Sequence, residues 1–257
     1  MKKLILALAL LFCAAPRCLA WGADGHRMVA EVAMHYLSPG TKEAVMKVLR
    51  KTTPEEASTW MDEMRSNNFY GYMRHWHYVD IAKDSQYVAG QGDNLIAALN
   101  TAYNEIKAGK VSKDKRKEDL MIIFHLIGDM AQPLHTGYPE DKGGNDVEVS
   151  YEGGGTNLHH VWDDDIIASE HITIDSCLQY AATLSQDDKK HFISGNFVAW
   201  MYDSRSHLPE AYDFPGHKID EAYAKKNKVL VERQIVAGGL RLARVLETLF
   251  GTPAAQG

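Results

Sequence analysis

The sequence predicts an all-α protein, mainly helical, that forms a single domain with a small β-hairpin or loop insertion. Apolar residues recur at helical spacing over most of the chain. No internal repeat, low-complexity segment or Pro/Gly-rich linker divides the part that follows residue 20. The exception to the helical pattern is residues 137–155, where alternating apolar and polar residues precede three consecutive glycines, which is typical of a hairpin or an extended loop.

Helix-start signals and apolar periodicity place the individual helices. Ser38 and Thr53 are suitable N-cap residues, and each is followed by proline at the first helical position. The strongly apolar helix that contains His125 must end before Pro133, because the residue that precedes a proline avoids the helical conformation. In chain order, the expected helices cover residues 24–36, 38–50, 53–64, 94–108, 117–130, 157–168, 175–184, 187–204 and 219–250.

The first twenty residues have the features of a secretory signal peptide. A short basic start precedes an apolar run, and small residues stand three and one positions before Trp21. We therefore expect residues 1–20 to be removed, which leaves residues 21–257 as one domain that is secreted or periplasmic. The apolar run is too short to span a bilayer, so an uncleaved anchor is the less favoured alternative, and no membrane association is expected.

Charge and cysteine content narrow the function classes. The formal net charge is −6, and it becomes −9 without the first twenty residues, because these contain three cations and no acid. This excludes binding of nucleic acid through bulk positive charge. Cys177 is the only cysteine after residue 20, so we expect no internal disulfide and consider bound metal as a source of stability.

Histidine, with 12 residues, is the unusual component, and it recurs near aspartate. His125 and Asp129 stand four residues apart on a predicted helix, as do His159 and Asp163, so each pair shares one face. An unpaired carboxylate on the apolar face of the first helix would be costly. Taken alone, that first pair is explained equally by a metal ion or by a buried hydrogen bond. His160 does not share the face of its neighbouring pair, so we expect it at the surface or outside the direct ligands.

Further candidate ligands surround these two pairs. His135 follows the end of the first helix, and Asp62 precedes a segment in which His75 and His77 would point in opposite directions if it were extended. Signal cleavage would also free the amine of Trp21, close to His26. Imidazole and carboxylate groups suit zinc, and nine candidate ligands are too many for one tetrahedral ion. We therefore expect a cluster of two or three metal ions, which is typical of phosphate ester hydrolysis.

Six motifs follow one another in a specific order. They are Trp-(4 residues)-His, Asp-x-x-Arg, Trp-His-Tyr-Val-Asp, His-Leu-Ile-Gly-Asp-Met-x-Gln-Pro-Leu-His, Gly-Gly-Asn and Asn-Leu-His-x-Val-Trp-Asp. Over nearly the whole chain after residue 20, this order resembles the S1/P1 nuclease family of secreted, zinc-dependent single-strand nucleases and 3′-nucleotidases, here as a bacterial member. The resemblance implies a fold like that of zinc phospholipase C and P1 nuclease.

The resemblance also implies the cofactors and the site residues. It implies three Zn²⁺ ions, the first held by Asp62, His77, His125 and Asp129, the second by His135, His159 and Asp163, and the third by Trp21, His26 and a bridging Asp129. It implies catalytic roles for Asp62, Arg65 and Asp129, phosphate binding by Arg65, base stacking by Tyr78, and hydrogen bonding to the base edge by Asp80 and Asn145. The expected substrates are single-stranded DNA, RNA and 3′-nucleotides, the products carry 5′-phosphates, and the enzyme is a monomer without an obligate protein partner.

Two other functions are alternatives. A zinc phospholipase C shares the fold, but its first histidine lies further from the N-terminal tryptophan and its last ligand is glutamate, whereas this chain has Asp163. A non-catalytic periplasmic zinc-binding protein would need neither Arg65 nor the pair Tyr78 and Asp80. A metalloprotease is disfavoured because the chain has no His-Glu-x-x-His motif.

Several residues are assigned structural positions. We expect three tryptophans to wall the site, namely Trp60, Trp76 and Trp162. We expect five histidines at a solvated surface, namely His35, His171, His191, His207 and His217. The apolar stripe of the last helix is expected to face the core.

Overall fold

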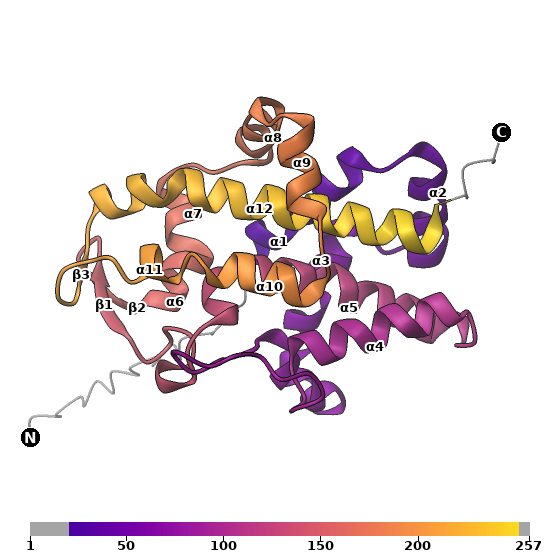
Figure 1. The fold of residues 1–257 in the computed structure, drawn as a ribbon, viewed down its shortest axis with the longest axis horizontal. Helices are drawn as coiled ribbons and strands as arrows, with labels where there is room; N and C mark the ends of the chain where they lie inside the picture. Colours follow the sequence, from indigo (N-terminus) through magenta and orange to yellow (C-terminus); the bar gives the residue numbers. More distant parts are fainter. Residues whose placement is uncertain (1–20, 252–257) are drawn as a thin grey trace, which may run out of the picture.

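The longest helix is the axis on which the other elements are arranged. In the computed structural model, residues 21–251 are described, and the expected signal peptide at residues 1–20 lies outside them. Helix α12 (Glu221–Phe250) runs along the length of the molecule (Figure 1), and α1 (Ala23–Tyr36) and α5 (Lys113–Ala131) pack against it. The mainly helical fold class that the sequence predicts is confirmed, and the buried apolar side chains form one continuous core.

The remaining elements are short. The other α-helices are α2 (Pro39–Leu49), α3 (Pro54–Glu63), α4 (Leu95–Ala108), α6 (Leu158–His160), α7 (Ile166–Ser169), α8 (Ile174–Thr183), α9 (Gln186–Ile193), α10 (Phe197–Arg205) and α11 (Leu208–Ala211). Four 3₁₀ helices are η1 (Met64–Ser66), η2 (Asn68–His77), η3 (Pro133–Thr136) and η4 (Pro139–Asp141), and η5 (Val161–Asp165) is a π-helix. The strands are β1 (Glu148–Tyr151), β2 (Gly154–Asn157) and β3 (Lys218–Ile219).

The predicted helix starts are confirmed by their hydrogen bonds. The Ser38 side chain accepts from the backbone N–H of Thr41, and Thr53 forms a reciprocal capping box with Glu56. These contacts satisfy backbone donors that a helix leaves unpaired in its first turn. Helix α5 is longer than expected, because Ser112 caps it one turn before the predicted start at residue 117.

The single helix predicted over residues 187–204 is wrong, because two helices replace it. Between α9 and α10, Gly195 has a φ of +84°, a conformation that few residues other than glycine adopt. The Asn196 side chain then accepts from the N–H of Ala199 and starts α10 as a new helix. Apolar periodicity continues across this break, so periodicity alone did not detect it.

The predicted hairpin is confirmed, and it has one unexpected partner. Strands β1 and β2 are antiparallel, and the turn between them contains Glu152 and Gly153, both at positive φ. Strand β3 adds in parallel to β1, which makes a three-stranded sheet. A strand of two residues has no detectable periodicity, so the sequence did not indicate it. Strand β2 leads directly into α6, which carries His159.

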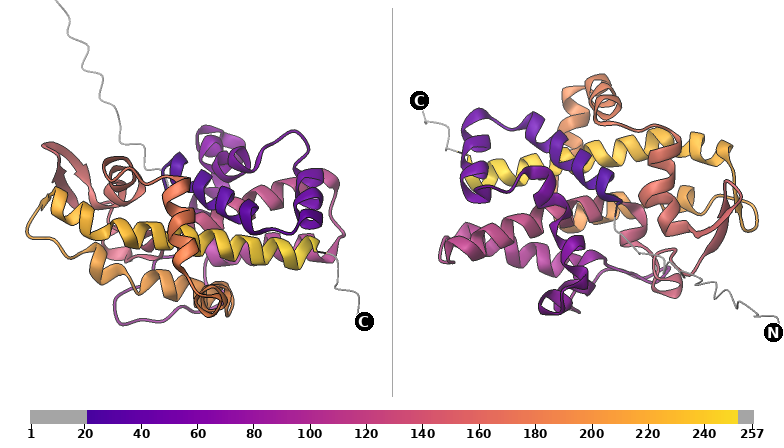
Figure 2. Two further views of the ribbon diagram at one scale, coloured as in Figure 1. Left: turned by 90° about the horizontal axis from the view of Figure 1, so that it is seen from above. Right: turned by 180° about the vertical axis from the view of Figure 1, so that it is seen from behind.

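Helix α5 brings polar groups into the centre of the molecule. All its residues from Leu120 to Ala131 are buried, and it packs against α3, α4, α1 and α12. In the view from behind (Figure 2), the start of α1 lies near the segment that contains η5 and α7, and α1 contacts both η5 and α5. No helix within residues 21–251 is long and apolar enough to cross a bilayer.

Candidate metal centre

Eight side chains predicted to bind metal converge from elements that are far apart in the sequence. His26 lies in α1, Asp62 in α3, His77 at the end of η2, His125 and Asp129 in α5, His135 in η3, His159 in α6 and Asp163 in η5. Their ligand atoms form three close groups, which are His26 with His125 and Asp129, Asp62 with His77 and His125, and His135 with His159 and Asp163. All of these side chains except Asp62 are buried. The fold therefore gathers the complete predicted set of side chains.

Asp129 belongs to the first group and also contacts two members of the second. Its Oδ1 atom is 3.2 Å from Nε2 of His26. Its Oδ2 atom is 3.1 Å from Nδ1 of His77 and 3.2 Å from Nε2 of His125. Asp62 approaches the same two rings, with its Oδ1 atom 3.7 Å from the His77 nitrogen and 3.9 Å from the His125 nitrogen. The two oxygens of one carboxylate thus face different sets of nitrogens, which is the arrangement of a bridging ligand.

The third group is built on a pair of histidines. The Nε2 atoms of His135 and His159 are 3.2 Å apart. Asp163 closes the group, with its Oδ2 atom 3.3 Å from Nε2 of His159 and its Oδ1 atom 3.9 Å from Nε2 of His135. All three residues are at least 95% buried.

Backbone carbonyls determine which ring nitrogen faces each group. The Nδ1 atoms of His125, His135 and His159 each lie 2.6 Å from a carbonyl oxygen, of Ser58, His77 and Gly143 respectively. A carbonyl can only accept, so each Nδ1 carries the proton and, in the neutral ring, each Nε2 is an acceptor. Two acceptors at 3.2 Å repel one another unless a cation lies between them. The tautomers therefore fit a metal ion.

Unsatisfied buried atoms provide a second test of this fit. Both ring nitrogens of His26, Oδ1 of Asp62 and Oδ1 of Asp129 are buried, and none of them makes a contact with hydrogen-bond geometry among residues 21–251. Their closest ionic contacts, at 3.2 Å, are those between His26 and Asp129 and between Asp62 and Arg65. A buried polar atom without a partner costs about 1–3 kcal/mol. One or more divalent cations would satisfy these atoms together. Imidazole and carboxylate donors without thiolate suit Zn²⁺ and related transition metals.

The protonation states of His135 and His159 agree with metal binding. Burial lowers the pKa of His135 to about 3 and the pKa of His159 to about 4, so both rings are neutral at pH 7, the form that ligates metal. Burial opposes ionisation of Asp129, but the charge of the neighbouring His125 holds the pKa of Asp129 well below its usual range. Burial raises the pKa of Asp163 well above its usual range, and a cation nearby would reverse that direction.

The ninth predicted ligand, Trp21, is buried at the start of the described chain. The next residue, Gly22, donates its N–H to the carbonyl oxygen of Asp163 at 2.9 Å, which ties the N-terminal segment to η5. A Cβ atom on Gly22 would lie 1.6 Å from Oδ1 of Asp164, so a larger residue here would have to displace the Asp164 side chain. The amine that cleavage would free is not a group of the uncut chain, so its role stays a prediction.

Sequence reasoning missed two residues that support the ligands. Gln132 donates from Nε2 to Oδ1 of Asp163 at 2.7 Å. A Cβ atom on Gly128 would lie 2.6 Å from Nδ1 of His26, so glycine makes room for this ring against α5. Both residues stand in the long motif around Asp129, and a glycine inside a buried helix is the signal that could have identified Gly128.

Arg65 lies at the edge of the ligand groups. It stands in η1, its side chain is 27% exposed, and its Nε atom is 3.2 Å from Oδ1 of Asp62. Tyr78 is 37% exposed, and its hydroxyl is 2.9 Å from Nδ1 of His75. The partly exposed positions of Arg65 and Tyr78 fit contact with a substrate.

Asp80 and Asn145 lie in two segments that are tied to the ligands. The backbone N–H of Val79 donates to the carbonyl of His135 at 2.8 Å, which fixes the segment that contains Asp80. Burial, followed by repulsion from Asp141, raises the pKa of Asp80 to about 7. Asn145 donates to the carbonyl of Lys142 at 2.9 Å, in the loop whose Gly143 carbonyl orients His159.

A third residue that sequence reasoning missed joins these segments. The Arg205 guanidinium donates to the backbone carbonyls of Thr136, Gly137 and Ile81. It therefore joins the segment that follows Tyr78 to the segment that follows His135. Arg205 comes from α10, about 70 residues further along the chain than Thr136, so only the fold reveals this role.

The structure confirms some of the positions predicted for the structural residues and corrects others. His35, His171, His191 and His217 are exposed, as predicted. His207 is not a solvated surface residue, because it is part-buried with Nε2 3.0 Å from Nη1 of Arg233. Trp162 belongs to the core, where its indole donates to the Tyr223 hydroxyl at 2.8 Å. His160 is 43% exposed and pairs with Asp164 at 3.2 Å, in agreement with its predicted place outside the direct ligands.

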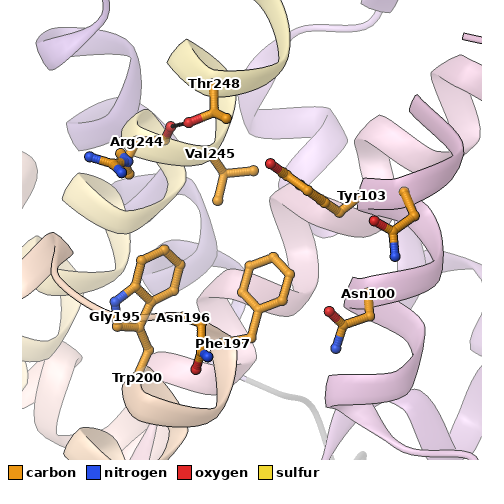
Figure 3. Close-up of a pocket in the computed structure, with 10 residues that line it drawn as sticks. Asn100, Tyr103, Gly195, Asn196, Phe197, Trp200, Arg244, Val245 and Thr248 are labelled. Atoms are coloured by element: carbon orange, nitrogen blue, oxygen red, sulfur yellow. Dashed lines mark hydrogen bonds between the residues drawn. The ribbon is translucent and has the colours of Figure 1, made fainter. Parts of the chain in front are cut away.

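A separate pocket of about 270 Å³ lies between α4, α10 and α12. Figure 3 shows Phe197, Trp200, Tyr103 and Val245 around it, with Asn100 at one side. Phe197 and Trp200 are more than 90% buried, and the Trp200 indole already donates to the carbonyl of Ser194. The pocket shares no residue with the three ligand groups.

Comparison with known proteins gives consistent matches. The family model described as S1/P1 Nuclease matches residues 21–251. Endonuclease 4 of Arabidopsis thaliana is 28% identical over 270 residues, which cover 91% of this chain and 90% of that protein. Nuclease S1 of Aspergillus oryzae is 25% identical over 91% of this chain and 93% of its own. Nuclease P1 of Penicillium citrinum is 30% identical over a shorter region, 56% of this chain and 57% of its own.

Proposed function

The chain belongs to the S1/P1 nuclease family, and from this premise we propose that it is a secreted tri-zinc endonuclease. It is a nuclease and therefore a phosphodiester hydrolase whose substrates are nucleic acids. We propose that single strands are the preferred form. We propose that it cleaves single-stranded DNA and RNA to products with 5′-phosphates and that it also removes phosphate from 3′-nucleotides. We further propose that residues 1–20 are removed, that residues 21–257 form one domain, and that the enzyme is a monomer.

The proposed zinc ligands are the residues of the three groups. Asp62, His77, His125 and Asp129 would hold one ion, His135, His159 and Asp163 a second, and His26, the freed amine of Trp21 and the shared Asp129 a third. The observation that carries this proposal is the opposed pair of acceptor nitrogens on His135 and His159, at 3.2 Å. Zinc in such a site acts as a Lewis acid on phosphate oxygens and makes water acidic enough to be a nucleophile near neutral pH.

A side chain next to the proposed metal ligands would bind the phosphate of the substrate. The Asp62 carboxylate lies 3.2 Å from Nε of Arg65, and this ion pair restrains the partly exposed guanidinium beside the metal ligands. A planar guanidinium can donate two parallel hydrogen bonds to phosphate and stabilise the charge that develops there. Arg65 would therefore position the scissile phosphate and contribute to catalysis, together with Asp62 and Asp129.

Base recognition is proposed for the segment that follows His77. The Tyr78 ring is 37% exposed and would stack on a base, with its hydroxyl restrained by His75. The Asp80 carboxyl has a pKa of about 7, because burial and then Asp141 raise it, so it can accept or donate a hydrogen bond at a base edge. Asn145, in the neighbouring loop, would add a second polar contact to the base.

The proposal is tested on exported protein purified without added metal. N-terminal sequencing should find Trp21, metal analysis should find three zinc ions per chain, and assays should detect cleavage of single-stranded DNA and RNA and phosphate release from a 3′-nucleotide. If the mature chain starts at a residue other than Trp21, or if two zinc ions per chain give full activity, the third zinc site is contradicted but the other two sites are not. Zinc-loaded protein that cuts no nucleic acid but hydrolyses phosphatidylcholine would reject the nuclease proposal.

A further inference from the structure

One segment beside the proposed metal centre differs in composition from the rest of the chain. Residues 64–78 contain five aromatic residues among fifteen, two arginines and no acidic residue, in a protein with 9% aromatic residues and a net charge of −6. Alternating aromatic and basic residues are typical of surfaces that bind single-stranded nucleic acid. The segment comprises η1, η2 and Tyr78, and η2 lies at the edge of the molecule beside α4 (Figure 1).

Three of these aromatic side chains are exposed to solvent. Phe69 is 74% exposed, Tyr72 is 49% exposed and Tyr78 is 37% exposed. They make up half of the six large hydrophobic side chains that are exposed within residues 21–251, and Phe69 is the most exposed of the six. An isolated exposed ring needs no explanation, but a group of rings within one short basic segment indicates a binding surface.

The segment is continuous with the proposed site at both ends. Arg65, the second residue of the segment, contacts Asp62, and the segment ends at His77 and Tyr78. Between them, Nη2 of Arg74 approaches the carbonyl of Arg65 at 3.5 Å, which places a second cation next to the proposed phosphate-binding residue. A strand whose scissile phosphate lies at Arg65 would therefore meet Arg74 and the exposed rings with its neighbouring nucleotides.

The Phe69 ring contacts the Tyr70 ring, which is itself packed against Trp60. Its ring centre is 5.0 Å from that of Tyr70 in an edge-to-face contact, and Tyr70 makes the same contact with Trp60 at 5.2 Å. Trp60 stands two residues before Asp62 on α3. These edge-to-face contacts restrain the Phe69 ring while most of its surface stays exposed, so a base would meet a ring that is already oriented.

We propose that Phe69 is a stacking subsite for a nucleotide outside the catalytic pocket and that Arg74 contacts a backbone phosphate of the same strand. The occupant is single-stranded nucleic acid, because the segment is basic in an acidic protein and is continuous with the ligands of the reaction site. The inference rests on the proposed nuclease function. It adds that substrate length, beyond the two nucleotides that flank the cleaved bond, contributes to binding.

The test compares one long and one short substrate. Phe69→Leu keeps apolar surface but removes the ring, and Phe69→Trp keeps a ring. For a twenty-nucleotide single strand, Phe69→Leu should raise KM by about fivefold or more, whereas Phe69→Trp should restore it. For a dinucleotide, which is too short to reach the subsite, kcat/KM of both variants should stay within about twofold of the parent enzyme.

Matched variants separate this effect from general damage. Val229→Ala removes exposed apolar surface on α12 (57% exposed) and should leave both substrates unaffected. Arg74→Gln should reduce the slope of log affinity against log salt by about 0.7 for the long strand, since one phosphate contact is lost.

The outcomes distinguish a failure of the proposed Phe69 subsite from a failure of the proposed nuclease function. An equal effect of Phe69→Leu on both substrates, no effect on either, or a change in oligomeric mass without a change in KM would overturn the subsite. Failure of the parent enzyme to cut the dinucleotide and the long strand would overturn the proposed function itself.

Discussion

The Nε2 atoms of His135 and His159 face each other at 3.2 Å, although backbone carbonyls hold the proton of each ring on its other nitrogen. Two proton-free nitrogens at this distance are unfavourable by themselves, and a cation between them would convert repulsion into coordination. Removal of metal should therefore affect the stability of the fold as well as the reaction.

Chelation should lower the melting temperature of the purified enzyme by about 5–10 °C, because binding of metal to the folded state alone stabilises it by mass action. The chain has no disulfide among its described residues to compensate, since Cys177 is buried and free. Differential scanning calorimetry with and without chelator measures the shift, and added zinc should reverse it. An unchanged melting temperature would show that the three groups hold no stabilising ion.

Gly128→Ala should displace His26, because the added Cβ atom would lie 2.6 Å from its Nδ1 atom. We expect the loss of one zinc ion per chain and a fall in kcat of at least about tenfold. Gly40→Ala is the matched control, since a Cβ atom there meets nothing within 4 Å and the position is also helical. Equal zinc content in the two variants would contradict the role of His26.

Gln132→Leu should weaken the site that contains Asp163, because the 2.7 Å hydrogen bond to Oδ1 of that carboxylate is lost. Loss of such a supporting hydrogen bond typically costs about 10–100-fold in metal affinity or activity. Competition with a zinc-binding dye measures the change, and Gln179→Leu, on the exposed side of α8, serves as the control. A parent-like affinity in Gln132→Leu would show that Asp163 needs no such support.

Arg65→Lys should lower kcat/KM by about 10–100-fold, because lysine keeps the charge but cannot donate two parallel hydrogen bonds to a phosphate. Zinc content should not change, since lysine keeps a positive charge beside Asp62, whose Oδ1 atom lies 3.2 Å from Nε of Arg65. The matched control is Arg27→Lys, whose guanidinium pairs with the exposed Asp24. A drop in zinc content would instead assign Arg65 to the support of the ligand Asp62.

Sequence patterns predicted the parts of the site that depend on short-range geometry. The spacing of His125 and Asp129 placed both on one helix face, and the structure has them in contact at 3.2 Å. N-cap chemistry at Ser38 and Thr53 correctly placed two helix starts. The same reasoning overlooked the break at Gly195, because apolar periodicity continues through it.

Contacts between residues that are distant in the sequence could not be predicted, for a physical reason. Arg205 binds carbonyls of segments more than 60 residues away, and Gln132 meets Asp163 only after α5 and η5 have packed together. His207 was expected in solvent and is instead part-buried beside Arg233 of α12. No local pattern reports such contacts, because each depends on how two distant elements are brought together.

The sequence by itself determined the family motifs, the helical class and the identity of the candidate ligands, since each of these depends on residue type and local spacing. The tertiary structure alone decided that the two oxygens of Asp129 face different nitrogens and that three carbonyls direct the Nε2 atoms of His125, His135 and His159 inward. Orientation of a side chain is set by the groups packed around it, and here those groups come from α3, η2 and the loop at Gly143.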